Sequence, residues 1–117
     1  MARVLQEVST EIQKCIDDCW ECHSVCLDAI DYCVRKGGAH AEPSHIRLLQ
    51  DCAAICRTSA DFMLRHSDFH GRVCEICAEI CEECADDCEE FEHDPAMKSC
   101  AEVCRRCAES CRQMAQA

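Results

Sequence analysis

The chain has 117 residues, of which 16 are cysteine, and its formal net charge at pH 7 is −11. This acidity argues against a nucleic-acid partner, whose phosphates it would repel, and no stretch is long and apolar enough to cross a bilayer. Leucine, isoleucine, valine and phenylalanine make up under a fifth of the chain. Such a composition is typical of disorder unless the cysteines, which pack as small hydrophobes when protonated, supply the core.

A first amphipathic helix is predicted over residues 4–36, because apolar residues and cysteines recur every three or four positions along one face, here called the seam. Gly37 and Gly38 can adopt the left-handed backbone conformation that ends a helix. A short loop leads to Pro43, which suits the first turn of a second helix over residues 43–66. The seam of the first helix reads Leu5, Val8, Ile12, Cys15, Cys19, Cys22, Cys26, Ala29 and Cys33. That of the second reads His45, Leu49, Cys52, Cys56, Ser59, Met63 and His66.

A third helix is predicted over residues 69–92, with Ser67 or Asp68 as its cap, and a fourth over residues 96–115, with Asp94 as its cap followed by Pro95. The third seam reads His70, Cys74, Cys77, Cys81, Cys84, Cys88 and Phe91. The fourth reads Met97, Cys100, Cys104, Cys107, Cys111 and Met114. All 16 cysteines therefore lie on seams. Four helices with short loops predict one all-α domain over residues 1–117, an antiparallel up-down-up-down four-helix bundle with a cysteine-lined core.

The N-terminal Met-Ala-Arg-Val-Leu-Gln-Glu is not a signal-peptide-like apolar run, so we expect a cytoplasmic protein whose thiols stay reduced. Reduced cysteines in this number point to metal rather than to disulfides. Parallel Cβ vectors also disfavour disulfides between neighbours on one helix.

Soft thiolates select Cu(I), Zn²⁺ or iron–sulfur clusters. Zinc and iron–sulfur sites use separate sets of four ligands, whereas these sulfurs form continuous ladders, which suit a monovalent ion shared between two or three thiolates. The expected donor pairs, four residues apart, are Cys15/Cys19, Cys22/Cys26, Cys52/Cys56, Cys77/Cys81, Cys84/Cys88, Cys100/Cys104 and Cys107/Cys111. We therefore predict many Cu(I) ions in the core, on the order of one per thiolate, with all 16 cysteines as ligands.

With its Cys-x-x-x-Cys and Cys-x-x-Cys repeats on four helices, the sequence resembles the bacterial copper storage proteins, and in particular their cytosolic branch. The resemblance covers nearly the whole chain. It implies a cytosolic bundle that stores Cu(I) for copper homeostasis, and a homotetramer of such bundles. The chain departs from the densest members of the family at Ser59 and Met63, which lowers the expected capacity of the second helix.

The two ends of the bundle carry weaker soft ligands suited to copper entry. One end is expected to bring together Met63, His66, His70 and Met114, and we propose it as the mouth for copper. The opposite end is the alternative mouth, although Leu49 and Phe91 there resemble a plug; it offers His45, Met97, Cys33, Cys88 and Cys100. The alternative is that the methionines fill space and His66 and His70 are loop-edge residues. We expect His23, His40 and His93 to be surface residues.

No catalytic motif is recognised, so we do not predict an enzyme. Three other functions stay open: zinc or mixed-metal storage, an iron–sulfur protein and a thiol redox sensor. Whether a copper chaperone or glutathione delivers the metal is also left open.

Overall fold

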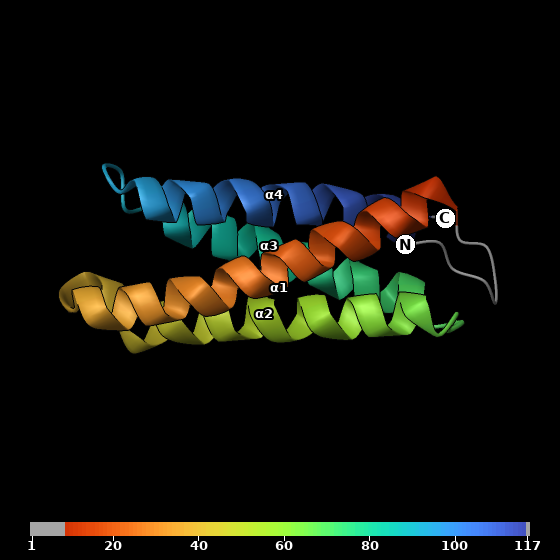
Figure 1. Cartoon of the computed structure of the whole chain (residues 1–117), viewed down its shortest axis with the longest axis horizontal. Coiled ribbons are helices and arrows are strands. Elements are labelled where there is room, and N and C mark those ends of the chain that lie inside the picture. The colour runs from red at the N-terminus through yellow and green to blue at the C-terminus, as the bar shows by residue number, and fades with distance from the viewer. Residues whose placement is uncertain (1–8, 117) are drawn as a thin grey trace.

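The computed structural model describes residues 9–116, which form four long α-helices and one short 3₁₀ helix (Figure 1). Their bounds are α1 Thr10–Lys36, η1 Gly38–Ala41, α2 Pro43–Leu64, α3 His70–Glu89 and α4 Pro95–Ala115. Successive helices run in opposite directions, and no strand occurs in the described range. The predicted all-α antiparallel bundle is confirmed. No helix within residues 9–116 is both long and apolar enough to cross a membrane.

The start of α1 is set by Ser9, whose backbone is extended (ψ 156°) and whose Oγ accepts a hydrogen bond from the N–H of Ile12 at 3.2 Å. The prediction of one helix that runs through Ser9 is therefore wrong. This serine satisfies one of the unpaired N–H groups of the first turn, which is what an N-cap does. The predicted start near residue 4 and the seam positions Leu5 and Val8 lie outside the described residues.

The helix ends differ from prediction by a few residues. Gly37 has a positive φ of 74° and its N–H bonds Cys33 O at 3.1 Å, so the predicted stop after α1 is confirmed. The loop after it contains η1, which was not predicted. α2 ends at Leu64 rather than 66, and His66 has a φ of 56°. α3 covers His70–Glu89 rather than 69–92.

The predicted cap of α3 by Ser67 or Asp68 is wrong. The N-cap position is Phe69, which makes no side-chain cap bond. The Ser67 Oγ instead accepts the N–H of Phe69 at 3.0 Å and so closes a local turn before the helix.

Asp94 caps α4 as predicted and also joins three elements. Its Oδ1 accepts the N–H groups of Ala96 (2.9 Å) and Met97 (3.3 Å). Its Oδ2 accepts the hydroxyl of Tyr32 on α1 (2.8 Å) and Nε2 of His40 in η1 (2.7 Å). Burial opposes ionisation, yet these four hydrogen bonds hold the pKa of Asp94 at about 2. The prediction that His40 is a surface residue is wrong, since its side chain is 14% exposed.

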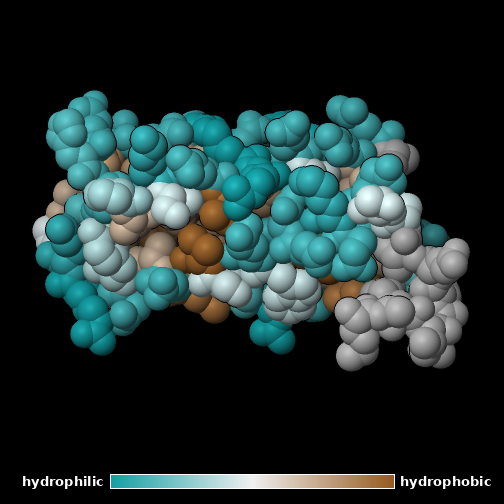
Figure 2. Space-filling view, turned by 45° about the horizontal axis from the view of Figure 1, so that its top comes forward, coloured by the Kyte–Doolittle hydropathy of each residue, from teal (hydrophilic) through white to brown (hydrophobic). Residues whose placement is uncertain are grey.

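The core is built mainly from cysteine and alanine. All 16 cysteines are at most 1% exposed. Alanines flank them on the inner faces of the helices, and these small side chains allow the helix axes to approach closely. The buried alanines are Ala29, Ala53, Ala60, Ala78, Ala85, Ala101 and Ala108. Hydrophilic side chains cover most of the outer surface seen in Figure 2. Ion pairs of Arg105 with Asp86 and Glu89 join α4 to α3.

Candidate metal centre

The cysteine side chains meet across the helices in the middle of the bundle. The Cys56 Sγ on α2 lies 3.8 Å from Cys77 Sγ and 3.6 Å from Cys81 Sγ on α3. It also lies 3.7 Å from Cys107 Sγ on α4, which is itself 3.7 Å from Cys19 Sγ on α1. One cluster of contacts therefore draws on all four helices.

Twelve cysteines fall into five groups in which every Sγ lies within 4.8 Å of the others, and we call these twelve the sulfur string. The groups, in spatial order, are Cys15–Cys74–Cys111; Cys19–Cys77–Cys107–Cys111; Cys56–Cys77–Cys81–Cys107; Cys22–Cys52–Cys56–Cys81; and Cys22–Cys26–Cys52–Cys104. Each group shares one or two sulfurs with the next. The string is therefore continuous rather than a set of separate sites.

Two triangles of sulfurs in the string have a size that suits a metal ion. Cys22, Cys52 and Cys104 are joined by Sγ–Sγ distances of 3.7, 3.8 and 3.9 Å. Cys56, Cys77 and Cys81 are joined by distances of 3.8, 3.6 and 3.9 Å. An ion at the centre of such a triangle would be about 2.2 Å from each sulfur, close to the metal–thiolate distance of about 2.3 Å known for zinc. The thiols thus stand near bonding positions for a three-coordinate ion.

Most close contacts join different helices, not residues four apart. Among the hydrogen-bonded contacts between the cysteines, all of which the structure describes, Cys77 and Cys81 (3.9 Å) form the one pair on a single helix. The expected pairs Cys22/Cys26, Cys52/Cys56 and Cys107/Cys111 do fall within shared groups. Three others do not share a group: Cys15/Cys19, Cys84/Cys88 and Cys100/Cys104.

Hydrogen bonds between the thiols divide charge unevenly along the string. Hydrogen bonds from neighbouring thiols, first of all Cys107, lower the pKa of Cys81 to about 4. Hydrogen bonding, again led by Cys107, together with burial raises the pKa of its neighbour Cys56. The pKa values of these two neighbouring thiols are therefore shifted in opposite directions.

The end of the bundle that holds η1 and the α3–α4 turn is here called the loop end. The four remaining cysteines lie in the parts of their helices next to these connections: Cys33 near the end of α1, Cys84 and Cys88 near the end of α3, and Cys100 near the start of α4. There the Cys33 Sγ lies 3.3 Å from Nε2 of His45 and 3.7 Å from Sδ of Met97. Burial raises the pKa of Cys33 to about 11. A thiol, an imidazole and a thioether therefore converge at this end.

A carboxylate and an aromatic ring hold His45 in place. His45 is 4% exposed and its Nδ1 is hydrogen-bonded to Oδ2 of Asp87. Because Nδ1 donates to a carboxylate, Nε2 keeps a lone pair directed toward Cys33, as in metal-binding histidines. The Phe91 ring packs against His45 (4.9 Å between centroids) and His40 (4.1 Å). Phe91 thus lies against both histidines, and Leu49, the other residue of the expected plug, is fully buried.

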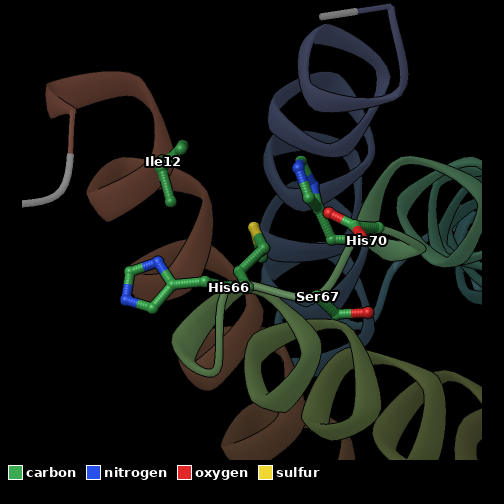
Figure 3. Close-up of a pocket in the computed structure, with 6 residues that line it drawn as sticks. Ile12, His66, Ser67 and His70 are labelled. Atoms are coloured by element: carbon green, nitrogen blue, oxygen red, sulfur yellow. The ribbon is translucent and has the colours of Figure 1, made fainter.

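The opposite end, here called the His70 end, contains a pocket lined by Ile12, Met63, His66, Ser67, Asp68 and His70. Figure 3 shows the rings of His66 and His70 extending in different directions rather than toward one point. His66 is exposed, whereas Nδ1 of His70 is buried and has no hydrogen-bond partner among residues 9–116. Met114 is buried and is not among the lining residues. This end gathers the predicted residues without converging their ligand atoms.

Three further sequence expectations can be compared with the structure. Ser59 is fully buried and its Oγ lies 3.3 Å from Cys74 Sγ, so it occupies a thiol position beside the string. The assignment of His23 to the surface is wrong, because its partly buried ring hydrogen-bonds Ala53 O at 2.8 Å. His93 is exposed. The contact of Asp87 with His45 and the hydrogen bonds of Asp94 to Tyr32 and His40 were not predicted, since partners distant in sequence leave no periodic signal.

Comparison with known proteins agrees with this geometry. A family model described as copper storage protein matches residues 8–116. A crystal structure of a protein from Nitrosospira multiformis is 45% identical, with 93% of this chain and 98% of that chain covered and a TM-score of 0.87. The Cu(I)-bound copper storage protein of Bacillus subtilis is 35% identical, with 91% and 99% covered and a TM-score of 0.84.

A cytosolic copper storage protein from Streptomyces lividans, described with five coppers, is 27% identical, with 92% and 93% of the chains covered and a TM-score of 0.79. No curated protein matches the chain.

Proposed function

The chain belongs to the copper storage protein family, as its cysteine pattern predicted, and from that membership we propose that it stores and buffers Cu(I) within the bundle. The observation that carries the proposal is the pair of sulfur triangles whose centres lie about 2.2 Å from each sulfur, near a metal–thiolate bond length. Copper could bind there with little movement of the helices.

The need to neutralise buried thiolates favours the binding of many monovalent ions. Sixteen uncompensated thiolates could not share a core, because each buried charge costs several kcal/mol. Each Cu⁺ that binds displaces a thiol proton, so the core stays close to neutral as it fills. We infer a capacity on the order of one Cu(I) per thiolate, because sulfurs shared between groups can each bridge two ions.

We propose the 16 cysteines as the storage ligands: Cys15, Cys19, Cys22, Cys26, Cys33, Cys52, Cys56, Cys74, Cys77, Cys81, Cys84, Cys88, Cys100, Cys104, Cys107 and Cys111. His45 would join Cys33 and Met97 at the loop end, as their convergence supports. At the His70 end, Met63, His66, His70 and Met114 are proposed as weaker ligands for entering ions. No catalytic residue is proposed.

An anaerobic titration of the reduced protein with Cu(I), in competition with a chromophoric Cu(I) chelator, tests the proposal. We expect the chelator to stay uncoloured until more than about ten equivalents per chain have been added. Colour after one or two equivalents would contradict storage.

Three further observations test the alternatives. Zinc storage predicts a colourless protein with about one metal per four sulfurs. An iron–sulfur protein would be brown on anaerobic isolation, and a redox sensor would form reversible disulfides in cells. The shared sulfurs of the string disfavour separate four-sulfur zinc sites.

We propose a cytoplasmic location, supported by the description of the Streptomyces lividans relative as cytosolic. A copper chaperone or glutathione is proposed to deliver the metal. We also propose a homotetramer, which the family resemblance implies. Trp20, Leu27 and Val34 on α1, 38%, 50% and 57% exposed at seven-residue spacing, form an apolar stripe that supports association between copies of the chain. Light scattering after size-exclusion chromatography would test this: a monomer at micromolar concentration would contradict it.

A further inference from the structure

A pocket opens in the side of the bundle between α1 and α4. Its volume is about 240 Å³, and its lining residues are Val25, Asp28, Ala29, Tyr32, Ala96, Met97, Ser99 and Cys100. Asp28, Ala96 and Ser99 are exposed and form the rim, whereas Met97 and Cys100 are at most 1% exposed and form the floor. The pocket therefore ends on a thioether and a thiol.

The position of this pocket follows from where α1 and α4 are fastened together. On one side the ion pair of Arg106 with Glu21 joins the helices, and on the other the hydroxyl of Tyr32 bonds Asp94. Between these two links, within residues 9–116, no hydrogen bond or ion pair joins exposed side chains of the two helices. Between the two links, the small side chains of Ala96 and Ser99 at the rim leave the pocket open. In Figure 2, hydrophobic side chains show through in the left half of this face, toward the loop end.

We propose that this pocket is a side port through which Cu(I) passes between an external monothiol carrier and Cys100, an inference that rests on the proposed storage function. Nothing in the described part of the pocket at the His70 end offers a cysteine, since its six lining residues include none. The side pocket, in contrast, reaches a storage thiol directly. Its volume is about that of eight waters at about 30 Å³ each, which admits an ion with a thiol arm but not a folded domain.

The transfer is a ligand exchange without any redox change. The carrier's sulfur–copper bond breaks, a Cys100 sulfur–copper bond forms, and the proton of the Cys100 thiol passes to the released carrier thiolate. The Met97 thioether, a soft neutral donor, can hold the ion while the two sulfurs exchange. Met97 also contacts Cys33 at 3.7 Å, so an ion at the port is one contact from the loop-end ligands.

Site-specific labelling of the thiols tests the port directly. The reduced apoprotein would be treated anaerobically with a small neutral alkylating reagent and its peptides quantified by mass spectrometry. We expect Cys100 to be labelled first. In Ala96→Trp, which fills the rim, labelling of Cys100 should slow by about tenfold, while Ala54→Trp, the same change at an exposed position of α2, should have no effect. Uniform labelling of all thiols, or earlier labelling of Cys74, would overturn the port.

Copper loading separates this inference from the storage function. With Cu(I) supplied as its 2-mercaptoethanol complex, Ala96→Trp should reach the wild-type capacity with a loading rate about tenfold lower. Asp28→Trp, at the exposed rim position on α1, should do the same, so that two variants guard against a folding defect in one. Wild-type rates in both variants would overturn the port and leave storage intact. A wild-type capacity of one or two ions would overturn the storage function itself.

Discussion

The sulfur string and the loop end use the same ligand in different surroundings. In the string, a thiol such as Cys56 is surrounded by other thiols at 3.6–3.8 Å, and sulfurs are shared between groups. At the loop end, Cys33 meets one imidazole and one thioether, and the imidazole is fixed by Asp87 and packed against Phe91. The string therefore offers one kind of ligand, the thiol, whereas the loop end offers three kinds.

The difference shows how a protein can separate capacity from control. Shared thiolates bind many soft ions and neutralise them, but they leave few ways to distinguish one position from another. A fixed imidazole and a thioether bind Cu(I) more weakly and only at one place. We therefore expect changes in the string to alter how much copper is held, and changes at the loop end to alter affinity and stability.

The largest effect is expected when four string cysteines become serine. Changing Cys52, Cys56, Cys81 and Cys107, which take part in four of the five groups, should remove more than about four Cu(I) per chain, since each of them serves several ions. The Cu(I) titration measures the loss. The matched control is the same change at the four loop-end cysteines, which should remove about four or fewer. An equal loss in both variants would mean that sharing has no effect on capacity.

A smaller effect is expected for His45→Ala. Capacity should fall by about one Cu(I), and the apoprotein should be less stable by about 2–3 kcal/mol, because a buried ring and its hydrogen bonds are lost. Urea denaturation and the copper titration would measure the two changes. Surface-exposed His93→Ala serves as the control and should change neither. Unchanged stability in His45→Ala would show that the ring is not held as described.

Ser59→Cys should sharpen the comparison by extending the string. Ser59 is fully buried 3.3 Å from Cys74 Sγ, so a thiol there would nearly preserve volume and complete a fourth ligand beside Cys15, Cys74 and Cys111. We expect about one additional Cu(I), while Ser59→Ala should add none. A gain in neither variant would indicate that this group does not bind copper.

The smallest effect on copper is expected for Asp94→Asn, which should leave capacity unchanged and cost about 1–2 kcal/mol of stability at neutral pH, because charge-assisted hydrogen bonds from Tyr32 and His40 are weakened. The folded pKa of Asp94 is about 2, below the usual value of about 3.9. Its stabilisation is therefore complete above about pH 4 and is lost as the pH falls through about 2. Melting temperatures of the two proteins should converge over that range; a constant difference would contradict the assignment.

The sequence was sufficient for the helices and the core because both depend on short-range periodicity. A cysteine at every third or fourth position can only be buried if it lies on the inner face of a helix, and all 16 are buried. The cap at Asp94 and the stop at Gly37 follow from residues adjacent in the chain. Serine is a common N-cap, so Ser9 could have indicated the start of α1 at Thr10. The prediction missed it because the seam pattern continues on both sides of Ser9.

The remainder depends on contacts between helices, which no single-helix pattern contains. The register that places Cys22 against Cys52 and Cys104 is set by packing, so the expectation of donor pairs four residues apart was only partly met. His40 and His23 were assigned to the surface because their partners, Asp94 and the Ala53 carbonyl, are far away in sequence.

The sharing of sulfurs between neighbouring groups has a consequence for transport. Because each of the five groups has at least one sulfur in common with the next, an ion can advance by releasing one thiolate while it still holds another. It need never leave thiolate coordination or meet water on the way. Copper would then move along the bundle axis in single steps, from one sulfur group to the adjacent one. An ion admitted anywhere on the string could therefore reach every group on it.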